Sequence, residues 1–262
     1  MLDSDLRDFR RWFSRYVRSF VPRSEEERRN FLLKERHTRE VLRNAERIAR
    51  EEGLSREKAR VAAAAALLHD VGRFPQLARY GTFRDASSVN HGLLGARVIE
   101  EEGLLAGLPE AERDVILAVV RYHNAFRVPD LGRPEAELCL RLIRDADKLD
   151  IWRVFSEWHD TPPGERSAAA NLGLSPKDAC TDAVLDAVKE GRIPSIDICR
   201  TGKDYVLVQL SWVHDLTFRT SFRILLKRDV LGRLGRVLPD GPAVREALER
   251  LAAYVKVRAA GP

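Results

Sequence analysis

The chain has 262 residues, of which 44% are hydrophobic and 32% charged, enough for a buried core with a charged surface. Its net charge is +5, and most of its arginines alternate with Glu and Asp, which indicates an ion-paired surface more than a nucleic-acid-binding one. No apolar run is long enough to span a bilayer. We therefore expect a cytoplasmic protein that has no membrane partner and for which nucleic acid is a disfavoured partner.

Apolar residues at three- and four-residue spacing predict helices along most of the chain. Residues 1–23 predict an amphipathic helix, without the apolar centre of a signal peptide. The spacing, together with capping residues and glycine stops, then predicts helices over 24–52, 55–71, 91–102, 109–124, 134–158, 175–190, 203–228 and 241–258.

Two segments need separate interpretation. Residues 72–90 contain two glycines, a proline and many polar side chains, so we expect a loop with room for little more than one short helical turn. Residues 203–212 are rich in Val and Tyr, which favours a strand, but the apolar spacing continues through Phe222 and favours a helix.

The Pro-Gly segment after residue 160 suggests a boundary, giving a helix at 1–23, a bundle at 24–160 and a helical extension at 165–262.

Four of the six histidines and two aspartates lie on predicted helices or beside their ends. They are His37, His69, Asp70, His91, His123 and Asp147. Antiparallel helices in a bundle can project such side chains toward one point. Imidazole and carboxylate suit a divalent Mn, Fe, Co, Ni, Zn or Mg ion, whereas the three scattered cysteines form no zinc motif. A bound ion of this kind activates water and polarises phosphoryl oxygens.

The order of these residues resembles that of the HD-domain superfamily of metal-dependent phosphohydrolases. Its pattern of His, His-Asp and Asp is matched by His37, His69-Asp70 in "LLHDVG", and Asp147 in "RDADKLD". The resemblance covers roughly residues 30 to 160. It implies an all-α, HD-type helical bundle, followed here by a helical C-terminal extension, and hydrolysis of a small phosphorylated substrate by metal-activated water.

The resemblance implies that His37, His69, Asp70 and Asp147 bind one divalent ion. His91 and His123 occupy places where some branches of the superfamily hold a second ion, so one ion or two remain open. Asp70 is then also the candidate catalytic carboxylate. The cations Arg73 and Lys148 are candidates for neutralising substrate phosphate, although ordinary ion pairs explain them equally well.

Other interpretations stay open at this point. The same scaffold supports di-iron oxygenases and nucleotide-sensing regulatory modules. Asp150 lies close to the helix face of Asp147 and could touch substrate or pair with an arginine. The dipeptides at His159 and His214 lack the context of the "LLHDVG" motif and are interpreted as structural. The apolar faces of the extension could cover the bundle or form a homodimer.

Overall fold

The computed structural model describes residues 1–162 and 175–261. Within those ranges the chain forms no β-strand, only an isolated bridge between Ser175 and Thr201. This confirms the predicted all-α class with helices in the C-terminal part. Residues 165–174 of the predicted extension lie outside the described residues.

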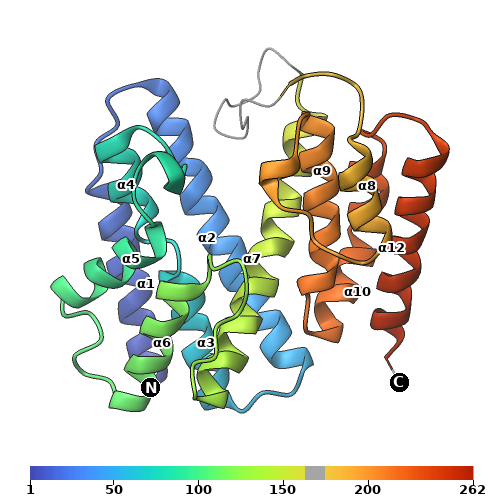
Figure 1. Cartoon of the computed structure of the whole chain (residues 1–262). Coiled ribbons are helices and arrows are strands. Elements are labelled where there is room, and N and C mark those ends of the chain that lie inside the picture. Colours follow the sequence, from blue (N-terminus) through green and yellow to red (C-terminus); the bar gives the residue numbers. More distant parts are fainter. Residues whose placement is uncertain (163–174, 262) are drawn as a thin grey trace. The chain divides into compact units, whose positions relative to one another are not determined.

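The chain divides into two compact units, Met1–Asp150 and Ile151–Pro262 (Figure 1). The first unit contains α1 (Asp3–Arg18), α2 (Glu25–Glu51), α3 (Arg56–Leu68), α4 (Arg73–Tyr80), the 3₁₀ turn η1 (Asp85–Ser87), α5 (His91–Glu101) and α6 (Glu110–Tyr122). Helix α7 (Pro134–Asp160) contributes to both units. The second unit continues with α8 (Asp182–Lys189), η4 (Ile196–Ile198), α9 (Gly202–Ser211), η5 (Trp212–Asp215), α10 (Arg219–Lys227), α11 (Val230–Gly235) and α12 (Pro242–Ala260). None of the described helices is both long and apolar enough to cross a membrane.

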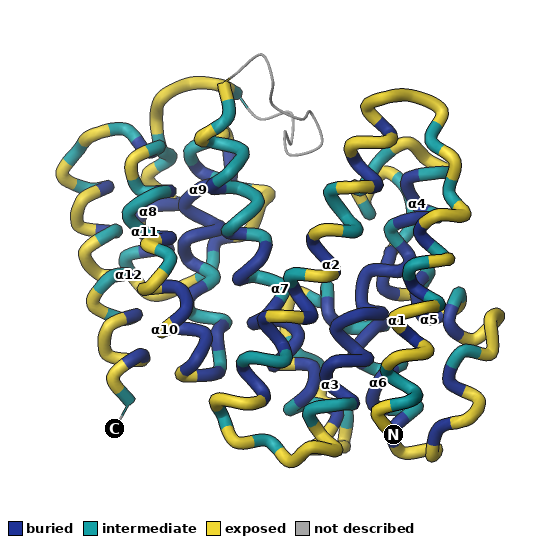
Figure 2. Tube along the Cα trace, turned by 180° about the vertical axis from the view of Figure 1, so that it is seen from behind, coloured by how far each residue is buried: buried dark blue, intermediate teal, exposed yellow. Residues whose placement is uncertain are grey.

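Helix α3 is the central element of the first unit (Figure 2). Every residue from Val61 to Leu68 is buried, and the helix packs against α1, α2 and α6. The alanine side chains of this run are small, so the neighbouring helices approach α3 closely. The helix ends directly before His69, which places the His-Asp pair at the buried end of a central helix.

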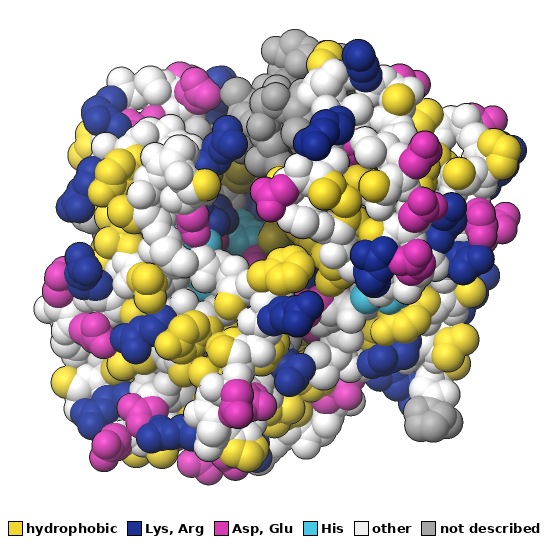
Figure 3. Space-filling model, in the orientation of Figure 1, with side chains coloured by type: hydrophobic (Ala, Val, Ile, Leu, Met, Phe, Trp, Pro, Cys, Tyr) yellow, Lys and Arg dark blue, Asp and Glu magenta, His cyan; other side chains and the backbone are white. Residues whose placement is uncertain are grey.

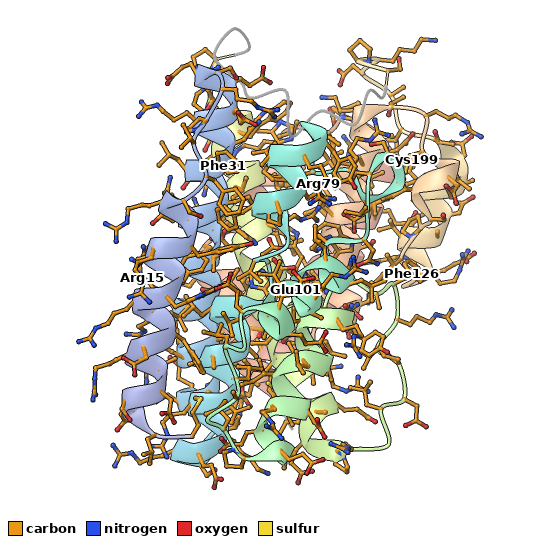
Figure 4. All side chains as sticks on the ribbon, turned by 90° about the vertical axis from the view of Figure 1, so that its left-hand side faces the viewer. Arg15, Phe31, Arg79, Glu101, Phe126 and Cys199 are labelled. Carbon is orange, nitrogen blue, oxygen red and sulfur yellow. The ribbon has the colours of Figure 1, made fainter. Side chains whose placement is uncertain are left out.

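Helix α1 is amphipathic and covers one side of this unit. It buries Phe9, Phe13 and Val17, whereas Arg15 is exposed on its outer side (Figure 4). The Phe13 ring meets the Phe74 ring of α4 edge to face, with ring centroids 6.0 Å apart. Aromatic packing of this kind fixes α4 against α1.

The prediction of a loop over residues 72–90 was wrong for its first half, because Arg73–Tyr80 form the two-turn helix α4. Pro75 lies in the first turn of the helix, where its missing N–H costs no hydrogen bond. Phe74 and Leu77 are buried, and Gly81 ends the helix in the left-handed conformation with φ of 67°.

In the second unit, helix rather than strand is present at residues 203–211, as predicted, but two helix lengths were wrong. The predicted helix over 175–190 is helical only from Asp182, because Thr181 donates its N–H and its hydroxyl to the Asp204 carboxylate. The predicted helix over 203–228 is interrupted at Trp212–Phe218. Leu216 and Phe218 adopt an extended backbone there while both side chains stay buried.

Two glycines allow backbones to meet without intervening side chains around the His-Asp pair. A Cβ on Gly72 would lie 2.2 Å from the backbone oxygen of His91 and 2.6 Å from the backbone nitrogen of Gly95. A Cβ on Gly92 would lie 2.9 Å from the backbone oxygens of Val120 and Arg121. The turn after α3, the start of α5 and the end of α6 therefore lie in direct backbone contact.

We expect Gly72→Ala to lower the free energy of unfolding by roughly 1–3 kcal/mol or more, because the added methyl group must displace the backbone of α5. Urea unfolding followed by circular dichroism measures this change. Gly107→Ala is the matched control, since its Cβ would meet nothing within 4 Å. Equal stability of the two variants would contradict the close-approach explanation.

Candidate metal centre

His69 and Asp70 follow the last residue of α3 and are both buried. The Nδ1 atom of His69 lies 2.7 Å from the backbone oxygen of Ala66, one turn earlier. A carbonyl oxygen can only accept, so Nδ1 carries the proton and donates it. In the neutral ring the other nitrogen, Nε2, is therefore unprotonated and carries a lone pair.

The other three histidines make the same kind of Nδ1 contact, each from a different helix or helix end. His123 Nδ1 lies 2.9 Å from the backbone oxygen of Val120. His91 Nδ1 lies 2.7 Å from Asp85 Oδ2, and His37 Nδ1 lies 2.7 Å from Asp150 Oδ2. Each Nδ1–H group therefore has an acceptor outside the centre, and a neutral ring presents the lone pair of Nε2.

All four Nε2 atoms surround the Asp70 carboxylate. His37 and His69 lie 3.6 and 3.7 Å from its Oδ2 atom. His91 and His123 lie 3.4 and 3.6 Å from its Oδ1 atom. The two carboxylate oxygens thus face two different pairs of histidines.

Asp147 of α7 completes the first of these pairs. Its Oδ1 atom lies 3.0 Å from His37 Nε2 and 3.9 Å from His69 Nε2. The six residues that the sequence singled out as candidate ligands therefore come together in the first unit. Two overlapping groups have the spacing of a metal site, namely His37, His69 and Asp70, and Asp70, His91 and His123.

The donor set fits a divalent cation. His69 Nε2 and Asp70 Oδ1 are buried atoms that make no hydrogen bond within the described part of the chain, and unsatisfied buried polar atoms are costly. His91 Nε2 and His123 Nε2 lie only 3.0 Å apart, although both carry lone pairs in the neutral rings. A cation between such atoms replaces this repulsion with coordination, and nitrogen and carboxylate oxygen are suitable ligands.

The protonation states of these groups also suit ligation. Burial lowers the pKa of His69 to about 4 and that of His91 to about 3. Burial would raise the pKa of Asp70, but Lys34 and His69 outweigh it and hold the pKa well below its usual value. Burial lowers the pKa of His37, yet its hydrogen bonds to Asp147 and Asp150 outweigh burial and raise it. In the absence of an ion, these two carboxylates therefore favour the protonated form of His37.

Of the two candidate catalytic cations, Arg73 lies at the centre. Its Nη1 atom donates to Asp85 Oδ1 at 2.9 Å, and its Nε atom lies 3.5 Å from Asp70 Oδ1. Lys148 follows Asp147 on α7 and is half-buried. Asp150 accepts the Nδ1–H of His37.

Sequence reasoning missed two charged residues that contact this centre. Asp85 accepts from His91, Arg73 and Gln76 at once, whereas the sequence marked only the polar character of its loop. Lys34, one turn before His37 on α2, places its Nζ atom 2.6 Å from Asp70 Oδ2. Its three-residue spacing from His37 was the available signal, because such residues share a helix face.

In metal-free protein we expect the rings of His69 and His91 to remain neutral as pH falls through the ordinary histidine pKa of 6.5. Their depressed pKa values mean that they stabilise the fold above pH 6.5 and that this contribution is lost as pH falls toward about 4 and about 3, respectively. Ring ¹⁵N chemical shifts in NMR spectra measure this titration. A ring that titrates near 6.5 would contradict the burial described here.

Comparison with known proteins agrees with this geometry. The family model of the HD domain matches residues 35–152, a segment that includes all six clustered side chains. Searches of curated proteins and of solved structures gave no significant match. Residues 35–152 therefore match the HD domain, and the match is consistent with the HD-domain superfamily whose residue pattern this segment resembles.

Proposed function

We propose that this protein is a metal-dependent phosphohydrolase that cleaves the phosphate ester of a nucleotide or another small phosphorylated metabolite. The observation that carries the proposal is the arrangement of four Nε2 lone pairs around one ionised carboxylate, Asp70. In all four buried imidazoles the Nδ1–H group points away from the centre, which is the orientation that metal binding through Nε2 requires.

The residues divide into two candidate ligand sets that share Asp70. His37, His69 and Asp147 surround its Oδ2 side, and His91 and His123 surround its Oδ1 side. A divalent ion held by either set would polarise a phosphoryl oxygen and lower the pKa of bound water. We therefore propose that the chain holds two ions, one in each ligand set, and that Asp70 contributes to both sets.

The remaining polar residues keep these ligands in position and supply positive charge. Asp85 and Asp150 accept the Nδ1–H groups of His91 and His37, which fixes ring orientation and raises ligand basicity. Arg73 is held by Asp85 and by the backbone oxygen of Phe83, so its guanidinium stays beside Asp70. There it would offset negative charge on the transferred phosphoryl group, and we propose the same role for Lys148.

A second candidate function has one observation in its favour. The pair His91 and His123 provides the additional histidines that a di-iron oxygenase on this scaffold also needs. Redox-active iron in the purified protein and oxygen uptake that depends on an organic substrate would favour this alternative. A nucleotide-sensing module would instead bind its ligand without forming product.

The surface charge of the protein supports a small anionic substrate. Basic and acidic side chains alternate over the face shown in Figure 3, which suits a small anionic substrate better than a nucleic-acid backbone. We also propose that the protein acts in the cytoplasm. A homodimer formed through the C-terminal helices remains a prediction.

We expect Asp70→Ala to abolish metal-dependent phosphate release, lowering it at least 100-fold, because both ligand sets lose their shared carboxylate. The assay offers nucleotides, cyclic nucleotides, sugar phosphates and an aryl phosphate to metal-stripped protein with added Mn, Co, Ni, Zn, Mg or Fe. Asp160→Ala is the matched control, since Asp160 belongs to another His-Asp dipeptide and pairs with Arg233. Undiminished hydrolysis in Asp70→Ala would overturn the proposal.

Metal content distinguishes the two ligand sets. We expect wild-type protein to bind two equivalents of Mn²⁺, and the double variant His91→Ala/His123→Ala to bind one, because only the second set is removed. Elemental analysis after equilibrium dialysis counts the ions, and circular dichroism checks the fold. A wild-type stoichiometry of one would contradict the two-ion proposal but not the hydrolase proposal.

A further inference from the structure

Lys34 forms an ion pair with Asp70, the carboxylate that the two proposed ligand sets share. Its Nζ atom lies 2.6 Å from Asp70 Oδ2. That oxygen is the one that faces His37 Nε2 and His69 Nε2. The other oxygen, Oδ1, makes no hydrogen bond within the described residues. The ammonium group is therefore the cation that neutralises the side of the carboxylate assigned to the first ion.

A metal ion bound to Asp70 Oδ2 and an ammonium group 2.6 Å from that oxygen would repel each other. Both are cations, and charges in a buried site are poorly screened. The lysine side chain has four flexible methylenes and can move its charge without any backbone change. Metal binding is thus expected to separate Lys34 from Asp70.

The surroundings of Lys34 combine access to solvent with an aromatic ring and a second cation. Its side chain is 18% exposed, whereas that of Asp70 is 4% exposed, so the lysine reaches toward solvent at the edge of the centre. The Phe83 ring lies beside it, with its centroid 5.6 Å from Nζ, and the Arg73 guanidinium lies 5.9 Å from the same centroid. Two cations on one aromatic ring at the edge of a metal centre form a suitable environment for an anion.

We propose that Lys34 is an exchangeable counter-ion, which neutralises Asp70 in the metal-free protein and binds a substrate phosphate group once the ion has displaced it. This inference rests on the proposed function, because it needs both the ion and a phosphorylated substrate. It makes Lys34 a substrate-binding residue that the sequence pattern does not mark. It also explains why helix α2 contains one lysine while its other cations are nearly all arginines. A flexible ammonium group leaves a carboxylate more readily than a planar guanidinium that binds both carboxylate oxygens.

The proposal predicts opposite effects of one substitution. In Lys34→Met, Mn²⁺ should bind about 10-fold more tightly, because the competing ammonium is gone. Inorganic phosphate should bind the Mn²⁺-loaded variant about 10-fold more weakly, because one of its cations is gone. Isothermal titration calorimetry measures both affinities without any knowledge of the natural substrate. Lys34→Gln is the second variant, and urea unfolding verifies that both are folded.

Lys58→Met is the matched control, because it removes the same charge from an exposed position in the first turn of α3. It should leave both affinities unchanged. If the wild type binds no Mn²⁺, the proposed function itself fails. If the wild type binds Mn²⁺ but Lys34→Met binds it no more tightly, the counter-ion role is overturned. If Mn²⁺ binding tightens while phosphate binding is unchanged, the substrate-binding role is overturned.

Discussion

The centre depends on one type of hydrogen bond, donated by the Nδ1–H group of each clustered histidine to an acceptor outside the centre. Two acceptors are backbone oxygens, of Ala66 and Val120, and two are the carboxylates of Asp85 and Asp150. Each bond fixes one ring orientation and one tautomer, so the Nε2 lone pair points toward Asp70. Without these bonds a ring could turn its Nε2 away from Asp70 or carry its proton on Nε2, and in either case Nε2 would bind no metal there.

The fold supplies these acceptors through close backbone packing. His69 and His123 each follow the last residue of a helix, and each donates to a carbonyl three residues earlier. Gly72 and Gly92 bring the turn after α3 and the helices α5 and α6 into backbone contact. Gly72 of the "LLHDVG" motif is therefore needed for the backbone packing around the centre. His69 and Asp70 of the same motif supply candidate metal ligands.

The sequence allowed prediction of the helical class and of six side chains that meet at one point, because helix periodicity and ligand chemistry are both local properties of the residues. It did not allow prediction of Asp85, whose role depends on how the loop folds over α5. Lys34 was overlooked because an ammonium group in a helix rich in Arg and Glu resembles its solvent-exposed neighbours. Helix α4 was missed because Pro75 suggests a loop unless its place in a first turn is known.

The most direct test is the anomalous scattering of Mn²⁺ in crystals of the protein. We expect density bonded to Asp70 and to the Nε2 atoms of His37 and His69, with a second site at the Nε2 atoms of His91 and His123. Metal–nitrogen distances should be close to about 2.1 Å. Crystals that bind no Mn²⁺ at Asp70, or that bind it through Nδ1 of any of these rings, would contradict the central claim.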